Sequence, residues 1–288
     1  MKNHQLTIYL FAAFLIAWGL EFVGIRSGKP LLVTLLTSLA MFAPLLGVWL
    51  SHKSLRSAVT GIHWKPVLKG HVRSLFAALW LPALFTAAGA ALYFILFPSR
   101  FDPQAGAFTR QIPSSGSTGG LSARTLLWIQ IITAFTAAPF INMFFAVGEE
   151  AGWRGYLTPQ LQQRLGRRSG LILSGIIWGV WHFLLIILTG YEYGTGYPGF
   201  PFTGCLAMCL FTVVLGILLS HLYEKTGCIW YPALAHGALN AIAGASLYFM
   251  KTIPQHYLLG PTIAGLIAVI PAAIFAFIVL LKQEPHSN

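Results

Sequence analysis

Long apolar runs are the feature that most constrains this chain of 288 residues. Crossing the hydrocarbon core of a bilayer as a helix takes roughly 20 mostly apolar residues, and segments of that kind recur along the whole sequence. Hydrophobic residues make up 56% of the chain and charged residues only 9%, whereas a soluble domain typically contains about 25% charged residues. The composition excludes an ordinary soluble enzyme and predicts an all-α, polytopic membrane protein.

Eight segments are long and apolar enough to be predicted as transmembrane helices. We expect them at about residues 6–25, 31–50, 75–97, 125–147, 171–189, 202–223, 228–250 and 259–281. The first could pass for a signal peptide, but it lacks a small-residue cleavage pattern and a second span follows it. It is therefore expected to stay attached as an anchor, and the chain to form a bundle of about eight transmembrane helices.

The basic charge of the chain, +11 at pH 7, is interpreted through the membrane. In a soluble protein such an excess could indicate a nucleic-acid partner, but in a membrane protein Lys and Arg collect in cytoplasmic loops. With eight spans, more Lys and Arg residues fall in loops on the side of the membrane that carries the N-terminus than in loops on the opposite side. We therefore expect a plasma-membrane protein with both termini in the cytoplasm, anionic lipid as a partner and no nucleic acid.

Ionisable residues inside spans are costly, so each is a candidate functional group. Glu21 lies near the end of the first span and is expected to reach the membrane interface. Glu150 and Arg154 are spaced i, i+4 on one helical face, so that their charges can neutralise each other. Glu149 points about 100° away around the same helix and is free to face another neighbour.

Three more polar residues belong to the later spans. His182 lies in the fifth span, and His236 and Asn240 share one face of the seventh at i, i+4. We expect them at a depth similar to that of Glu149, in the cytoplasmic half. Polar side chains of this kind can also simply hold helices together, but two adjacent carboxylates, two histidines and an asparagine at matched depth favour an intramembrane site.

The residue types indicate a hydrolytic reaction. A carboxylate beside a neutral imidazole can take a proton from water, and Glu149 with His182 would make that pair. His236 and Asn240 could donate hydrogen bonds to the oxyanion of a tetrahedral intermediate. Since no G-x-S-x-G turn or Cys/His pair suggests a covalent nucleophile, hydrolysis of an amide by activated water is the simplest interpretation.

A metal site is the open alternative to this water-activating pair. Glu149, His182 and His236 are an acceptable ligand set for a catalytic Zn²⁺, although the sequence contains no H-E-x-x-H motif. From the sequence the cofactor is therefore either none or zinc. The three cysteines show no metal or redox spacing and are expected to be small buried side chains.

These motifs, in this order, resemble those of the CPBP family of intramembrane proteases. The pattern comprises Glu149-Glu150-x-x-x-Arg154, Trp178-x-x-x-His182 and His236-x-x-x-Asn240. The family includes type II CAAX prenyl endopeptidases of the Rce1 kind and bacterial Abi proteins linked to bacteriocin self-immunity. The resembling region covers about 144–245, and the earlier spans match only in hydrophobic character.

The resemblance implies an eight-helix protease, often catalogued as a metalloprotease, with a core at 125–288 and a variable N-terminal membrane region at 1–124. It implies that Glu149 and His182 activate water, that His236 and Asn240 contact the oxyanion, and that Glu150 and Arg154 support Glu149. The expected substrate is a membrane-associated polypeptide that is cut near its C-terminus, with a prenylated, CAAX-type polypeptide as one such substrate. The sequence does not indicate the oligomeric state.

Two other functions stay open at this stage. The protein could be a non-catalytic or bacteriocin-immunity member whose polar cluster holds a membrane partner. It could also be a proton-coupled transporter, although the sequence suggests no chain of titratable groups leading from the cluster to the far side of the membrane.

Overall fold

The computed structural model describes residues 2–52, 60–111, 120–252 and 254–282. These parts of the chain form helices joined by loops, with two isolated β-bridges and no strand. The predicted all-α fold is confirmed.

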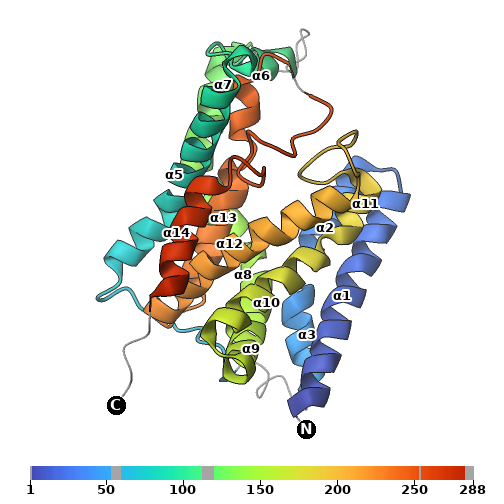
Figure 1. Cartoon of the computed structure of the whole chain (residues 1–288), viewed down its shortest axis with the longest axis vertical. Helices are drawn as coiled ribbons and strands as arrows, with labels where there is room; N and C mark the ends of the chain where they lie inside the picture. Colours follow the sequence, from blue (N-terminus) through green and yellow to red (C-terminus); the bar gives the residue numbers. More distant parts are fainter. Residues whose placement is uncertain (1, 53–59, 112–119, 253, 283–288) are drawn as a thin grey trace.

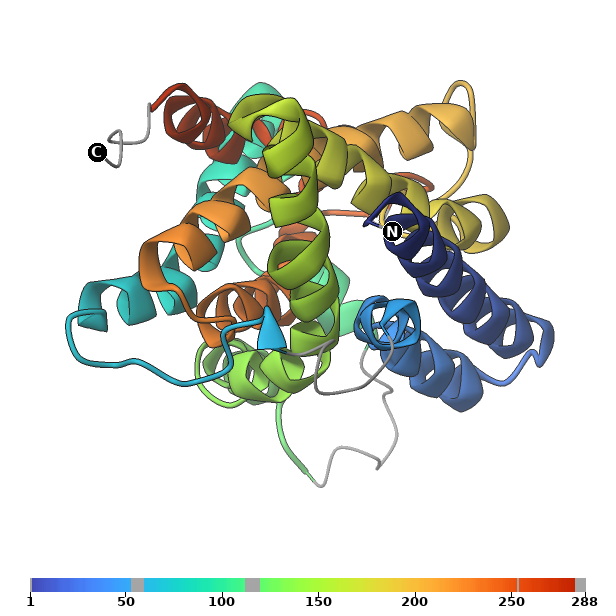
Figure 2. The same ribbon diagram turned by 90° about the horizontal axis from the view of Figure 1, so that it is seen from below.

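The helices form two groups with a central layer between them (Figures 1 and 2). One group consists of α1 (Lys2–Arg26), α2 (Pro30–Ala40) and α3 (Ala43–Ser51). The other contains α5 (Val72–Leu96), α13 (Trp230–Ile242) and α14 (Ile270–Leu281). The start of α1 and the end of α14 lie at the same end of the molecule (Figure 1).

The central layer is a helical hairpin. One arm runs through α8 (Ala138–Gly152), the π-helical turn η2 (Trp153–Leu157) and α9 (Thr158–Leu165), and the other is α10 (Arg167–Trp181). The remaining elements are η1 (Pro98–Arg100), α6 (Gly106–Gln111), α7 (Ala123–Phe135), α11 (Phe183–Thr189), α12 (Phe202–Thr226) and η3 (Ala245–Phe249).

Four helices are long and apolar enough to cross a membrane. They are His4–Arg26, Val72–Leu96, Arg167–Thr189 and Phe202–Thr226. Two bent pairs, Pro30–Ala40 with Ala43–Ser51 and Ala123–Phe135 with Ala138–Leu165, raise the number to as many as six. The protein is therefore an integral membrane protein by the length and composition of its helices, but eight spans are not confirmed.

The difference lies in the last two predicted spans, which contain shorter helices than the apolar runs suggest. Within 228–250, α13 has 13 residues and is followed by the 3₁₀ segment η3. Within 259–281, α14 has 12 residues and begins at Ile270, with Pro271 in its first turn. Proline is common in the first turn of a helix, because the N–H group that it lacks would have no partner within the helix there. Hydropathy alone does not detect where a helix begins inside an apolar run.

The hairpin explains why two distant residues lie at the same level. It turns at Gly166, whose φ of +79° lies in the region that favours glycine. Glu149 precedes this turn by almost as many residues as His182 follows it. With a rise of about 1.5 Å per residue, both lie roughly 25 Å along their arms.

Glycines allow α12 and α13 to pack closely against the two arms of the hairpin. A Cβ atom on Gly237 of α13 would lie 2.4 Å from the backbone nitrogen of Met143 on α8. A Cβ on Gly179 of α10 would lie 2.6 Å from the Cα of Cys209 on α12. Small residues of this kind let membrane helices approach closely. The α8 to α13 contact carries His236 to the doubled glutamate.

Candidate active site

A cavity of about 330 Å³ lies where the two helix groups meet the central layer. Its lining includes Glu149 from α8, His182 from the junction of α10 and α11, and both His236 and Asn240 from α13. The structure thus brings together all four residues that the sequence predicts to carry the chemistry, although they come from three separate parts of the chain.

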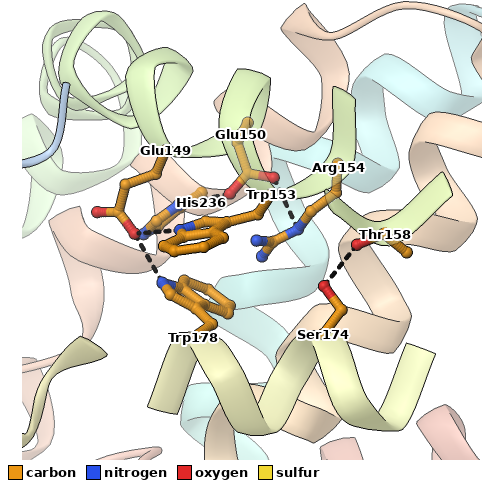
Figure 3. Close-up of polar contacts among 8 residues, drawn as sticks. All are labelled: Glu149, Glu150, Trp153, Arg154, Thr158, Ser174, Trp178 and His236. Atoms are coloured by element: carbon orange, nitrogen blue, oxygen red, sulfur yellow. Dashed lines mark hydrogen bonds and ion pairs between the residues drawn. The ribbon is translucent and has the colours of Figure 1, made fainter. Parts of the chain in front are cut away.

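Two tryptophans orient the Glu149 carboxylate, as Figure 3 shows. The indole Nε1 of Trp178 donates a hydrogen bond of 2.7 Å to Glu149 Oε2, and that of Trp153 donates one of 3.3 Å to the same oxygen. The side chain is buried, with 3% of its surface exposed. Both bonds end on Oε2, so Glu149 Oε1 has no indole donor (Figure 3).

Glu150 bridges two buried cationic or titratable groups. Its Oε2 lies 2.9 Å from Arg154 Nε, which confirms the predicted i, i+4 pair. Its Oε1 lies 2.8 Å from His236 Nδ1, a contact between α8 and α13 that the sequence does not reveal. The guanidinium of Arg154 also lies 4.0 Å from the centre of the Trp178 ring, in the geometry of a cation–π contact. Trp178 therefore contacts Glu149 directly and the partner of Glu150, Arg154.

The partners of the two histidines indicate which ring nitrogen carries hydrogen. His182 Nδ1 lies 2.9 Å from the carbonyl oxygen of Trp178, which can only accept, so Nδ1 donates. His236 Nδ1 donates in the same way to the Glu150 carboxylate. A neutral ring in either position keeps its lone pair on Nε2. His236 can therefore donate to an oxyanion from Nε2 only in its doubly protonated form, with Glu150 beside it to balance the charge.

The predicted pair of Glu149 and His182 is not a direct hydrogen bond in the described parts of the chain. Glu149 instead accepts from the two indoles, and His182 donates to the backbone. Both side chains line the same cavity, so a molecule held between them can contact each one. Trp178 lies between the two residues: its indole donates to Glu149, and its carbonyl oxygen accepts from His182.

The same arrangement does not fit the predicted zinc set. Among the residues that the structure describes, no group of three or more His, Cys, Asp or Glu side chains is placed to hold a metal ion. Glu149, His182 and His236 all line the cavity but are not among such groups. The three cysteines are free; Cys205 and Cys228 are buried, as the sequence predicts, whereas Cys209 is partly exposed.

Glu21 corrects one expectation from the sequence. It does not reach the membrane interface: only 1% of its surface is exposed, and it lines the cavity together with Glu149. The distance of a residue from the end of an apolar run does not reveal which way its helix face turns. The face of α1 that carries Glu21 packs toward α10, and two indole hydrogen bonds join these helices.

The loop after α11 adds two further polar residues that the sequence analysis missed, Tyr191 and Glu192. The Tyr191 ring stacks on His182, with centroids 6.0 Å apart and planes 6° from parallel. Burial raises the pKa of Tyr191 well above its usual value, and nearby carboxylates, Glu192 first, raise it further. Burial also raises the pKa of Glu192, which a hydrogen bond from Tyr191 partly offsets. No motif in the sequence marks these residues.

Comparison with known proteins relates the region of the site to a known family. Residues 124–242, less than half of the chain, match the family described as type II CAAX prenyl endopeptidase Rce1-like. A relative from Methanococcus maripaludis, named CAAX prenyl protease 2, is 42% identical over 62 residues. That alignment covers 21% of this chain and 23% of the relative.

The matched region contains the six ionisable or amide residues of the motif pattern: Glu149, Glu150, Arg154, His182, His236 and Asn240. It also contains Trp153 and Trp178, which hold Glu149. The segment 124–242, which carries these residues, is therefore similar to the type II CAAX prenyl endopeptidase Rce1-like family.

Proposed function

We propose that this protein is an intramembrane endopeptidase that cuts a peptide bond near the C-terminus of a membrane-associated, prenylated polypeptide. The observation that carries the proposal is the cavity itself, in which Glu149, His182, His236 and Asn240 meet. The family of residues 124–242 and the name of the archaeal relative support the same reaction class. Substrate and lipid group are inferred from that family.

The proposed reaction begins with water held between Glu149 and His182. Glu149 takes a proton from the water as its oxygen attacks the scissile carbonyl, while Nε2 of His182 accepts a hydrogen bond from the same water. The C=O bond becomes a C–O⁻ bond, to which His236 and Asn240 donate hydrogen bonds. The C=O bond then re-forms as the C–N bond breaks, and Glu149 returns the proton to the leaving nitrogen. The products are a carboxylic acid and an amine, and transfer of the acid proton to the amine leaves a carboxylate and an ammonium group.

Trp153, Trp178, Glu150 and Arg154 have positioning roles in this proposal. The indoles fix one oxygen of Glu149, and the Glu150 carboxylate orients His236 from its Nδ1 side. Arg154 neutralises Glu150 within the bundle. A base and an oxyanion donor held this firmly need little reorganisation during the reaction.

We propose that this reaction proceeds without a metal. Protein washed with a chelator in detergent is expected to retain its activity, with zinc far below one equivalent by elemental analysis. Loss of activity that added Zn²⁺ restores would contradict this part of the proposal.

We also propose a plasma-membrane location with both termini in the cytoplasm, a core at 125–288 and a separate N-terminal region at 1–124. The start of α1 and the end of α14 lie at the same end of the molecule, which supports termini on the same side of the membrane (Figure 1). Cysteine-labelling at added terminal residues in intact cells, compared with lysed cells, tests this arrangement. Labelling of either terminus in intact cells would contradict it.

The activity is tested with purified protein and farnesylated C-a-a-X peptides. Cleavage is expected for the natural sequence and is expected to be absent for Glu149→Ala and His182→Ala at unchanged melting temperature. Glu224→Ala, which removes a carboxylate outside the cavity, is the matched control and is expected to cleave normally. If both cavity variants cleave as well as the natural protein, the protease proposal fails. Peptide binding without cleavage would favour a non-catalytic or immunity role.

A proton-coupled transporter is the second candidate, and one observation favours it. Glu21 and Glu192 line the cavity besides Glu149, so its titratable groups extend from α8 to α1 and to the loop after α11. The sequence suggests no such chain. Proteoliposomes with an internal pH dye test this function. Proton uptake that Glu21→Gln abolishes would support transport, whereas peptide cleavage with no proton flux would contradict it.

A further inference from the structure

Glu21 is a buried carboxyl group that the proposed reaction does not use. Only 1% of its surface is exposed, and its Oε2 has no hydrogen-bond partner among the described parts of the protein. Burying an unpaired carboxylate is costly, and such groups are normally paired or neutralised. Glu21 also lines the cavity, so its carboxyl group lies at the cavity wall.

Two hydrogen bonds fix the position of Glu21 relative to the reacting groups. Trp18 Nε1, one helical turn before Glu21, donates to the carbonyl oxygen of Trp181 at 2.9 Å. Trp181 Nε1 donates to the carbonyl oxygen of Ala13 at 3.2 Å. Since Trp181 ends α10 and directly precedes His182, these bonds hold α1 against the end of α10, next to the imidazole of the proposed reaction. Glu21 is thus fixed with respect to the proposed site of cleavage.

The same cavity contains two more carboxyl groups. Glu149 lines it from α8 and Glu192 from the loop after α11. Tyr191, which precedes Glu192 in that loop, lines the cavity together with all three. No Lys or Arg belongs to the described lining. Arg154, the nearest buried cation described above, is engaged by Glu150 and by the Trp178 ring (Figure 3).

We propose that Glu21, together with Glu192, forms a subsite that binds a cationic group of the substrate, the ammonium of a lysine or the guanidinium of an arginine. A cation entering the cavity gives the Glu21 carboxyl the hydrogen-bond donor that the fold leaves out. The inference rests on the proposed function, since it assigns specificity to the same cavity. It predicts that a basic residue beside the scissile bond improves binding.

Equilibrium binding of a lysine scan tests the subsite. The probes are farnesylated hexapeptides with lysine, or norleucine as its uncharged counterpart, at each position in turn. They are titrated in detergent against the full chain carrying Glu149→Gln, which prevents hydrolysis. At one position lysine is expected to bind at least about tenfold more tightly than norleucine, the usual scale of a hydrogen bond to a charged group.

Variants of the subsite decide whether Glu21 is responsible. In the Glu149→Gln chain, Glu21→Gln is expected to reduce the lysine preference to within about twofold, and Glu21→Asp to keep most of it. Glu224→Gln changes the net charge equally outside the cavity and is expected to keep the full preference. Glu192→Gln, a second cavity variant, is expected to weaken the preference. The melting temperature of Glu21→Gln is expected to equal or exceed that of the parent, because an unpaired buried carboxyl is removed.

Two results would overturn the subsite: no position at which lysine is preferred, or a preference that survives both Glu21→Gln and Glu192→Gln. Cleavage by the natural sequence is measured separately. Cleavage without any lysine preference would overturn the subsite and leave the protease proposal standing. Lysine-selective binding without cleavage would leave the subsite standing and overturn the protease proposal.

Discussion

The indole of Trp178 donates a hydrogen bond of 2.7 Å to the carboxylate of Glu149 and so ties α10 to α8 at the cavity wall. The same ring carries Arg154 on one face and contacts the edge of His236, with ring centroids 5.4 Å apart. One side chain therefore touches the proposed base, the buried cation and the proposed oxyanion donor. Its position couples the geometry of all three.

Trp178→Phe removes the indole donor and keeps an aromatic ring in the bundle. Glu149 then keeps only the 3.3 Å bond from Trp153, and we expect kcat/KM to fall about hundredfold because the base is no longer held in place. Trp230→Phe is the matched control, since it removes an indole hydrogen bond of 2.9 Å to the Trp64 carbonyl away from the cavity. Equal activity losses in the two variants would contradict a positioning role for Trp178.

Glu150→Gln leaves Arg154 buried without its carboxylate. Only 2% of the arginine surface is exposed, and breaking a buried ion pair on one side costs about 3–5 kcal/mol of unfolding free energy. The double variant Glu150→Gln with Arg154→Met removes both charges and is expected to recover a large part of that loss. Chemical unfolding in detergent measures both values. A double variant no more stable than Glu150→Gln would contradict the pairing.

Gly237→Ala tests the close approach of α13 to α8. Its Cβ would lie 2.4 Å from the Met143 backbone nitrogen, so we expect a loss of about 1–3 kcal/mol in unfolding free energy and a loss of cleavage as His236 moves from Glu150. Gly244→Ala is the control, because a Cβ there meets nothing within 4 Å. If Gly237→Ala unfolds and cleaves like Gly244→Ala, the proposed contact does not position His236.

Glu192 makes a predicted contribution to the pH dependence of stability. Its folded pKa is raised above the usual 4.5, mainly by burial, so the folded protein retains a proton that the unfolded chain loses. This contribution is fully present below about pH 4.5 and is lost as the pH rises through the folded pKa. Glu192→Gln cannot ionise, so its stability relative to the natural protein is expected to rise across that window. Parallel melting curves from pH 4 upward that never diverge would contradict the shift.

The sequence predicts those features of the site that are local in the chain. Glu150 and Arg154 pair as expected because i, i+4 spacing puts them on one helical face wherever the helix lies. The convergence of the four cavity residues was predicted from matched depth along the spans, and it is found. For Glu149 and His182, the similar depth follows from their similar distances along the chain from the turn at Gly166, and these distances can be counted in the sequence.

The contacts between distant helices could not be predicted in the same way. The bond from His236 to Glu150 depends on how α13 is rotated against α8, and the bond from Trp178 to Glu149 on how the hairpin arms face each other. A membrane helix carries apolar residues on its lipid-facing side as well as on its packed side. Hydropathy therefore does not indicate which side of the helix faces its neighbours. Glu21 was misplaced for this reason, and the short helices α13 and α14 were hidden within longer apolar runs.

The substitution Glu149→Gln tests the central claim most directly, because it keeps the shape of the side chain and its hydrogen bond from Trp178 but cannot take a proton from water. Initial rates on one farnesylated peptide, measured for both proteins in the same lipid vesicles, decide the question. We predict that the rate falls at least about hundredfold, the usual contribution of a general base, with an unchanged melting temperature. A Glu149→Gln protein that cleaves at the natural rate would contradict the account.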